Sequence, residues 1–144
     1  MKKDFSIVHE LKDINSLIFR KISSRYKEMG MDVTPVHAKI IMSIYKSDVP
    51  VCQKDLEGPI SCNKSSLSNV INTMEKNGLL VRKASFDDSR INYLELTDTA
   101  LEIAEFLRKD REIIEKELCN GISEEEKNIF YSIISKVREN LERI

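Results

Sequence analysis

Residues 63–97 read NKSSLSNVINTMEKNGLLVRKASFDDSRINYLELT, and this stretch decides the fold of the 144-residue chain. In its first half, apolar residues recur at positions 67, 70, 71 and 74, which is the spacing of one buried helical face. In its second half, two short runs of strand-forming residues follow a glycine that can end a helix. The pattern predicts a helix over 63–77, a strand over 79–84 and an antiparallel partner strand over 92–97.

The other face of this predicted helix carries short hydrogen-bonding side chains and no large apolar group. A helix of this length, about 20 Å at 1.5 Å per residue, fits a DNA major groove, and small side chains allow close approach. Its N-terminal end favours a phosphate, and Lys64 lies in that first turn. The polar face consists of Ser65, Ser66, Ser68, Asn69, Asn72, Thr73 and Lys76.

The loop between the two predicted strands, residues 85–91, is too long for a two-residue turn and should project as a tip. Its Arg90 would reach a neighbouring minor groove. Asp88 stands two residues earlier and should pair with the guanidinium group, holding it in one direction. The alternative is an incidental surface ion pair worth under about 1 kcal/mol.

Further helices are expected on both sides of this stretch. Residues 4–28 have a long apolar stripe, and Thr34 and Pro35 make a start signal for the next helix. A short strand at 49–51 and a short helix within 53–59 should follow.

After the hairpin, Thr99 and Glu102 fit a capping box for a helix that ends near Leu118. Ser123 and Glu126 fit a second capping box for a final amphipathic helix. The predicted fold class is therefore mainly α with a small β-hairpin, in a winged helix-turn-helix arrangement.

The chain should form a single domain, residues 1–144. Residues 34–97 would be the winged helix-turn-helix part, and residues 1–33 with 98–144 would be a helical dimerisation part. The long helices carry more apolar face than one small core can cover, and a two-fold homodimer would cover it.

Composition narrows the function classes. Hydrophobic residues make up 41% of the chain and charged residues 33%, which is typical of a globular protein. The net charge of −1 does not indicate a nucleic-acid partner, but its distribution does: residues 98–144 hold twelve acidic and eight basic residues. A phosphate-binding surface is therefore expected in residues 1–97, where basic residues exceed acidic ones by three.

The sequence predicts no membrane association and a cytoplasmic location. No apolar run approaches the roughly 18 residues that a membrane span needs, and no signal peptide is visible. The three cysteines lack zinc-ligand spacing and suggest a reducing compartment. Cys52 is expected to cap a helix weakly and Cys62 to pack in the core; whether Cys62 senses redox state is left open.

No cofactor, metal or catalytic residue is expected. His9 and His37 are too few and too far apart for a metal shell. No nucleophile–base pair or glycine-rich phosphate loop is present, so an enzyme is not predicted. His37 could line a ligand pocket, although a histidine there is more often only packed and hydrogen-bonded.

The sequence resembles the MarR (multiple antibiotic resistance regulator) family of transcriptional regulators. Residues 88–97, DSRINYLELT, are similar to the family's wing signature, D-x-R-x-x-x-[LV]-x-L-T, and residues 74–82, MEKNGLLVR, resemble its L-E-x-x-G-[LW]-[IV]-x-R. The resemblance implies a homodimer on a palindromic operator, with wings in the minor groove. It also implies repression that a small molecule or an oxidant relieves.

Ten residues are the predicted DNA-binding set: Lys64, Ser65, Ser66, Ser68, Asn69, Asn72, Thr73, Arg82, Asp88 and Arg90. Lys64 and Arg82 are expected to contact phosphates. Where the family often has arginine, this chain has Asn69 and Thr73. Asparagine suits adenine edges, so an A·T-rich operator and modest affinity are expected.

The leading interpretation is a cytoplasmic, dimeric transcriptional regulator that binds double-stranded DNA, and more specifically a repressor. The alternative is a winged-helix protein-interaction module that has lost DNA binding, which the near-neutral net charge favours slightly. Neither the effector, the operator nor the regulated genes can be read from the residues.

Overall fold

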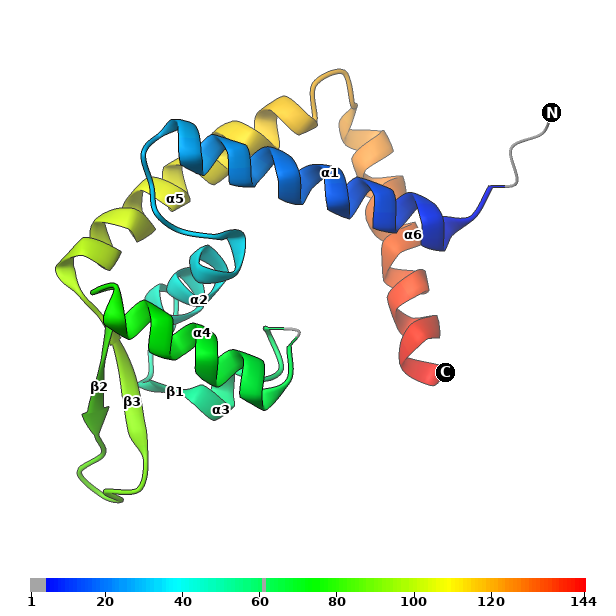
Figure 1. The fold of residues 1–144 in the computed structure, drawn as a ribbon. Coiled ribbons are helices and arrows are strands. Elements are labelled where there is room, and N and C mark those ends of the chain that lie inside the picture. The colour runs from blue at the N-terminus through cyan, green and yellow to red at the C-terminus, as the bar shows by residue number, and fades with distance from the viewer. Residues whose placement is uncertain (1–4, 61) are drawn as a thin grey trace. The chain divides into compact units, whose positions relative to one another are not determined.

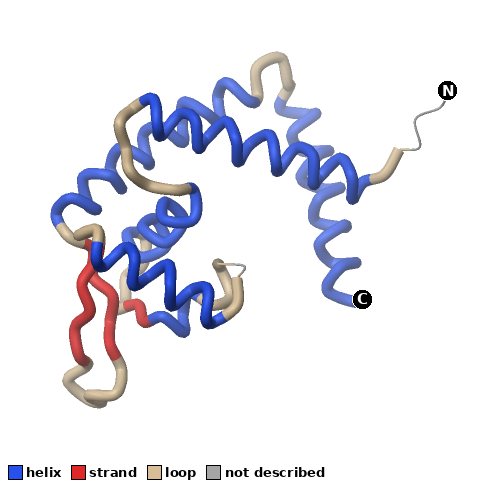
Figure 2. Tube along the Cα trace, viewed as in Figure 1, coloured by secondary structure: helices blue, strands red, loops and turns tan. Residues whose placement is uncertain are grey.

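The structure, a computed structural model, describes residues 5–60 and 62–144 of the chain. Within these residues it consists of helices with one small sheet (Figures 1 and 2). The elements are α1 (Ile7–Glu28), α2 (Pro35–Tyr45), β1 (Val51–Cys52), α3 (Gln53–Leu56), α4 (Lys64–Lys76), β2 (Leu80–Ala84), β3 (Asn92–Leu96), α5 (Asp98–Leu118) and α6 (Glu124–Arg143). The predicted fold class is confirmed.

The chain divides into two compact units, Met1–Leu107 and Arg108–Ile144, with the boundary inside α5. Among the described residues, every buried apolar side chain belongs to the first unit. The second unit contains the remainder of α5 and all of α6. The prediction of a single domain over 1–144 stays a prediction.

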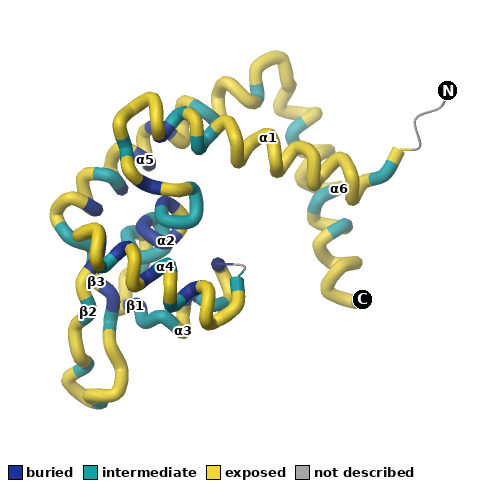
Figure 3. The backbone as a smooth tube through the Cα atoms, in the orientation of Figure 1, coloured by how far each residue is buried: buried dark blue, intermediate teal, exposed yellow. Residues whose placement is uncertain are grey.

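The core of the first unit takes buried side chains from α2 and α4 and also from β1, α3, the two hairpin strands and the first half of α5. Buried segments are dark blue in Figure 3. In α2, Ile40 and Ile41 are both fully enclosed. The buried face of α4 is the predicted one, since Leu67, Ile71 and Met74 are all fully enclosed. The polar face of α4 must therefore point away from the core.

The sheet has the strand order β1-β3-β2, and both pairs are antiparallel. Leu80 pairs with Leu96 and Ala84 with Asn92, so β2 and β3 form the predicted hairpin. This register places Leu94 toward the core and Glu95 toward solvent, as the alternation predicts.

Helix starts follow the capping signals in the sequence at two predicted positions. The amide of His37 donates to Thr34 Oγ1 over 3.1 Å, ahead of Pro35 at the first helical position. The amide of Glu126 donates to Ser123 Oγ over 3.1 Å, and the Ser123 amide donates to Glu126 Oε2 over 2.8 Å. Both predicted starts are confirmed.

Three predicted boundaries are wrong or shifted. The short strand lies at Val51–Cys52 rather than 49–51, because Pro50 has no N–H to give to a ladder. α1 begins at Ile7 behind Ser6, whereas the predicted start at residue 4 lies outside the described residues. The predicted capping box of Thr99 with Glu102 does not open α5, which begins at Asp98.

Thr97 caps α5 instead. Its Oγ1 accepts the Ala100 amide at 3.3 Å, and its carbonyl accepts the Leu101 amide at 2.9 Å. The same hydroxyl donates to the carbonyl of Gly78 at 2.6 Å. Thr97 therefore ties together the end of α4, the end of the hairpin and the start of α5.

α1 leaves most of its apolar stripe outside the core. Tyr26 is buried and Ile22 is partly buried, but Val8 and Leu17 are each 57% exposed. This is the surplus apolar surface that the sequence predicts for this helix.

Candidate nucleic-acid interface

The polar face of α4 is exposed along its length. Ser65, Ser66, Asn69, Asn72 and Thr73 are all exposed, and so is Lys64 in the first turn. The side chain of Asn63 caps the helix by accepting the Ser66 amide at 2.7 Å. The sequence therefore places these side chains correctly on a solvent-facing helix surface.

Three members of this face already make side-chain hydrogen bonds within the protein: Ser68, Thr73 and Asn72, the last with Arg82 as described below. Ser68 is half-buried, and its Oγ accepts Nε2 of Gln53 at 2.7 Å, so it braces α4 against α3 rather than standing free. The Thr73 hydroxyl donates to the carbonyl of Asn69 at 2.9 Å, leaving its oxygen as an acceptor and its methyl group exposed. Ser68 is therefore only partly exposed, and its predicted part in DNA binding stays a prediction.

The wing tip has the predicted pair. Arg90 Nε lies 3.1 Å from Asp88 Oδ1 and Nη2 lies 3.2 Å from Oδ2, a two-point contact. The Arg90 amide also donates to Asp88 Oδ1 at 3.0 Å. The guanidinium group, followed by that amide, lowers the pKa of Asp88 below its usual value of 3.8. The Arg90 side chain is nevertheless 88% exposed, so it is both held and accessible.

Arg82 on β2 is predicted to contact a phosphate, but in the structure its guanidinium group is bonded to side chains of α4. Its Nη1 lies 2.8 Å from Glu75 Oε1, and its Nη2 donates to Asn72 Oδ1 at 2.7 Å. Both partners belong to α4, so this arginine joins the wing to the helix. Sequence reasoning missed this contact; the one available signal was a glutamate and an arginine seven residues apart, across the helix–strand junction.

His37 takes part in helix capping. Its Nδ1 accepts the Thr34 amide at 3.3 Å, which requires that nitrogen to be unprotonated. Partial burial lowers the pKa of His37 below 6.5, outweighing the opposite effect of Asp32. The residue does not line either of the two clefts described below.

Acidification should destabilise the protein through His37. Because its folded-state pKa is lowered, the unfolded chain binds a proton that the folded chain excludes. The stability that neutral His37 provides is complete above pH 6.5 and is lost as the pH falls through the lowered pKa. Urea unfolding on either side of pH 6.5 should show a smaller pH effect for His37→Gln than for the wild type. Equal pH effects in the two proteins would contradict the capping role.

The cysteines have structural surroundings. The Cys52 amide donates to Asp55 Oδ2 at 2.9 Å and its thiol lies 3.2 Å from the same oxygen, at the start of α3. Cys62 is half-buried against the core. The position of Cys62 agrees with the expected packing role. The Cys52 side chain makes no cap hydrogen bond, and the Asp55 carboxylate makes the contact at the start of α3 instead. In the described part of the chain, no three His, Cys, Asp or Glu side chains are grouped to hold a metal ion.

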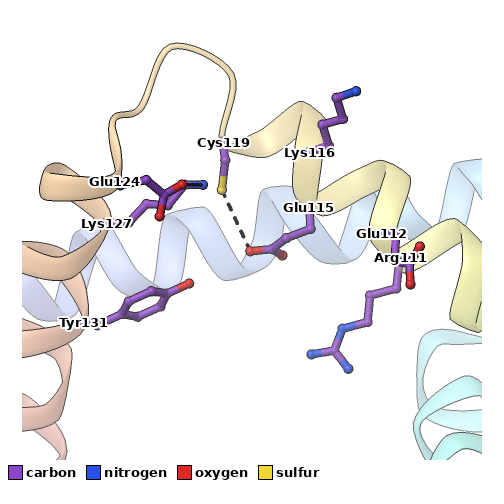
Figure 4. Close-up of a pocket in the computed structure, with 8 residues that line it drawn as sticks. All are labelled: Arg111, Glu112, Glu115, Lys116, Cys119, Glu124, Lys127 and Tyr131. Carbon is purple, nitrogen blue, oxygen red and sulfur yellow. Dashed lines mark hydrogen bonds and ion pairs between the residues drawn. The ribbon is translucent and has the colours of Figure 1, made fainter.

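Two clefts are open to solvent. One, of about 350 Å³, lies at the wing base in the first unit and is lined mainly by apolar side chains of α2, β1, β3 and the start of α5. The other, of about 630 Å³, lies in the second unit at the turn between α5 and α6 (Figure 4). Its lining mixes cations and anions: Arg111, Glu112, Glu115, Lys116, Cys119, Glu124, Lys127 and Tyr131.

The chain is similar in sequence to known transcriptional regulators. Residues 33–91 match the sequence profile of the MarR family. A Bacillus subtilis protein described as an uncharacterized HTH-type transcriptional regulator, YdgJ, is 22% identical over 142 residues, covering 99% of this chain and 83% of that protein.

Solved structures share the fold. Staphylococcus aureus MepR in complex with DNA superimposes with a TM-score of 0.85 at 19% identity, covering 96% of this chain and 99% of MepR. A MarR protein from Peptoclostridium difficile gives 0.83 at 19% identity, covering 99% and 91%.

The exposed polar helix followed by a hairpin defines a winged helix-turn-helix protein, a DNA-binding fold. The likeness to the MarR family of transcriptional regulators is shown over residues 33–91, which hold the helix-turn-helix and the first half of the wing. The described residues contain no helix with the length and hydropathy that a bilayer crossing needs.

Proposed function

We propose that the protein is a cytoplasmic repressor that binds a palindromic operator as a homodimer and releases it when a small molecule binds. The observation that carries the proposal is the joint exposure of the α4 polar face and of Arg90, held by Asp88, in one folded unit. α4 would enter the major groove and the wing the neighbouring minor groove. MepR, which shares the fold, has a structure in complex with DNA.

The contacts divide into base-reading and phosphate-positioning groups. Ser65, Ser66, Asn69, Asn72 and Thr73 would face base edges. Lys64, at the start of α4, would contact a phosphate, whereas Ser68 would support the helix from behind.

The homodimer is supported by apolar surface that the single chain leaves uncovered. All residues of α6 are described and none is buried. The apolar side chains of Ile129 and Ile133, on one face of the helix, are 60% and 50% exposed. Together with the exposed stripe of α1, this surface needs a partner, and a second copy of the chain provides one through a two-fold axis.

For the effector, the apolar cleft at the wing base is the candidate site. Its volume of about 350 Å³ lies within the range of small-molecule pockets, and its lining is apolar. A ligand there would contact both Ile44 of α2 and Leu94 of β3, and so could shift the wing relative to the helices. This would couple ligand binding to DNA release.

Selection of bound DNA from random sequence tests the function. We expect enrichment of two inverted, A·T-rich half-sites with centres about 10 base pairs apart. Binding should weaken with rising salt, and a true effector added to the selected DNA should release it. Absence of binding even at low salt would contradict the proposal and favour a protein-interaction module.

A further inference from the structure

Arg82 makes two contacts with α4, and together they determine how Asn72 faces solvent. Its guanidinium group lies between Glu75 Oε1 at 2.8 Å and Asn72 Oδ1 at 2.7 Å. The Arg82 side chain is only 28% exposed, so it is packed at the junction of β2 and α4 rather than extended into solvent.

The contact with Asn72 fixes an amide that would otherwise rotate. An asparagine amide has one acceptor oxygen and a two-proton donor nitrogen, and a free one can present either or both. Here the oxygen is turned toward Arg82, so the NH₂ group is left for an outside partner. Because Glu75 holds the other side of the guanidinium group, Arg82 is itself fixed in direction.

We propose that Arg82 is a positioning residue for base recognition, which holds Asn72 as a hydrogen-bond donor toward the major groove. The inference rests on the proposed DNA binding and adds a specificity to it. A bare NH₂ donor suits guanine, whose N7 and O6 are both acceptors. It suits adenine poorly, because reading N6 and N7 together requires the amide oxygen as well.

The operator prediction changes at one position as a result. The guanidinium group of Arg82 is hydrogen-bonded to Glu75 and Asn72, so Asn69 keeps the two-point readout of adenine. Asn72 should instead select guanine, placing one G·C pair in each otherwise A·T-rich half-site.

The competing role for Arg82 is a direct phosphate contact, and the two roles predict different results. A phosphate contact is independent of sequence, so its loss weakens binding to all sites equally and reduces the salt dependence. Loss of a positioning residue changes which base is preferred at one position. Glu75 already neutralises the Arg82 charge, which argues against the phosphate role.

The test is binding-site selection and titration with full-length Arg82→Met and Arg82→Lys variants. Lysine keeps the charge, but its single ammonium group cannot take both the Glu75 and Asn72 positions. We expect both variants to shift the preference at one base pair of each half-site from guanine to adenine, by roughly tenfold. In an Asn72→Ala background, the same Arg82 substitutions should leave base preference unchanged.

Lys83→Met is the matched control, because Lys83 is the next wing cation and pairs with Glu95 across the hairpin at 2.8 Å, away from α4. It should not change base preference. A uniform loss of affinity with an unchanged base preference in the Arg82 variants would overturn the positioning role. A wild-type protein that binds no DNA would instead overturn the proposed function, and this inference with it.

Discussion

Arg90→Glu should reduce operator affinity roughly 100-fold or more while leaving the dimer intact. Each wing would lose a groove contact and gain a negative charge against the phosphates, and a dimer presents two wings. The Arg90 side chain is 88% exposed, its polar partner is Asp88 in the same loop, and it lies outside the core cluster, so its replacement removes no core packing. Electrophoretic mobility shifts measure the affinity, and sedimentation measures the dimer.

Two further variants separate the wing contact from a general change of charge. Lys109→Glu makes the same change at an exposed position of α5, outside residues 34–97, and should have a much smaller effect. Asp88→Ala keeps the arginine but removes the carboxylate that orients it, so an intermediate loss is expected. If Arg90→Glu bound as tightly as the wild type, the wing would have no part in the interface.

The difference between Arg90 and Arg82 shows what local sequence can predict. The Asp88–Arg90 contact spans two residues within one loop, so spacing alone indicates it, and the structure confirms it. The Arg82 contacts depend on where β2 leaves α4 and on which face of the strand the arginine occupies. That geometry is set by the strand register and the turn at Gly78, which spacing does not determine.

The same reasoning accounts for the surroundings of Ser68 and for the start of α5. Ser68 belongs by helical periodicity to the exposed face, but α3 packs beside it and supplies Gln53 as a partner. A capping-box pattern predicts the start of α5 at Thr99, whereas Thr97 accepts the Ala100 amide and also donates to the Gly78 carbonyl. In both cases the side chain bonds to a residue of another segment, and the sequence pattern of a single helix cannot predict such a contact.

The apolar face of α6 supports the second large expected effect. A solvated helix whose residues are all at least partly exposed would not keep a continuous apolar stripe without a partner. Ile133→Asp, at a position 50% exposed in the single chain, should therefore convert the dimer to monomer at micromolar concentration. The physical reason is that a two-fold interface would bury two unpaired carboxylates, one from each copy.

Operator binding should fail together with dimerisation, because a monomer holds one half-site and loses the gain from linking two contacts. Ser135→Asp is the matched control: it adds the same charge to an exposed position on the opposite, polar side of α6, and should leave mass and affinity unchanged. Circular dichroism should show that Ile133→Asp retains its helices, since this side chain contributes nothing to the core cluster. A dimer that survives both Ile133→Asp and Ile129→Asp would mean that α6 does not form the interface, and would leave the exposed stripe of α1 as the surface to test.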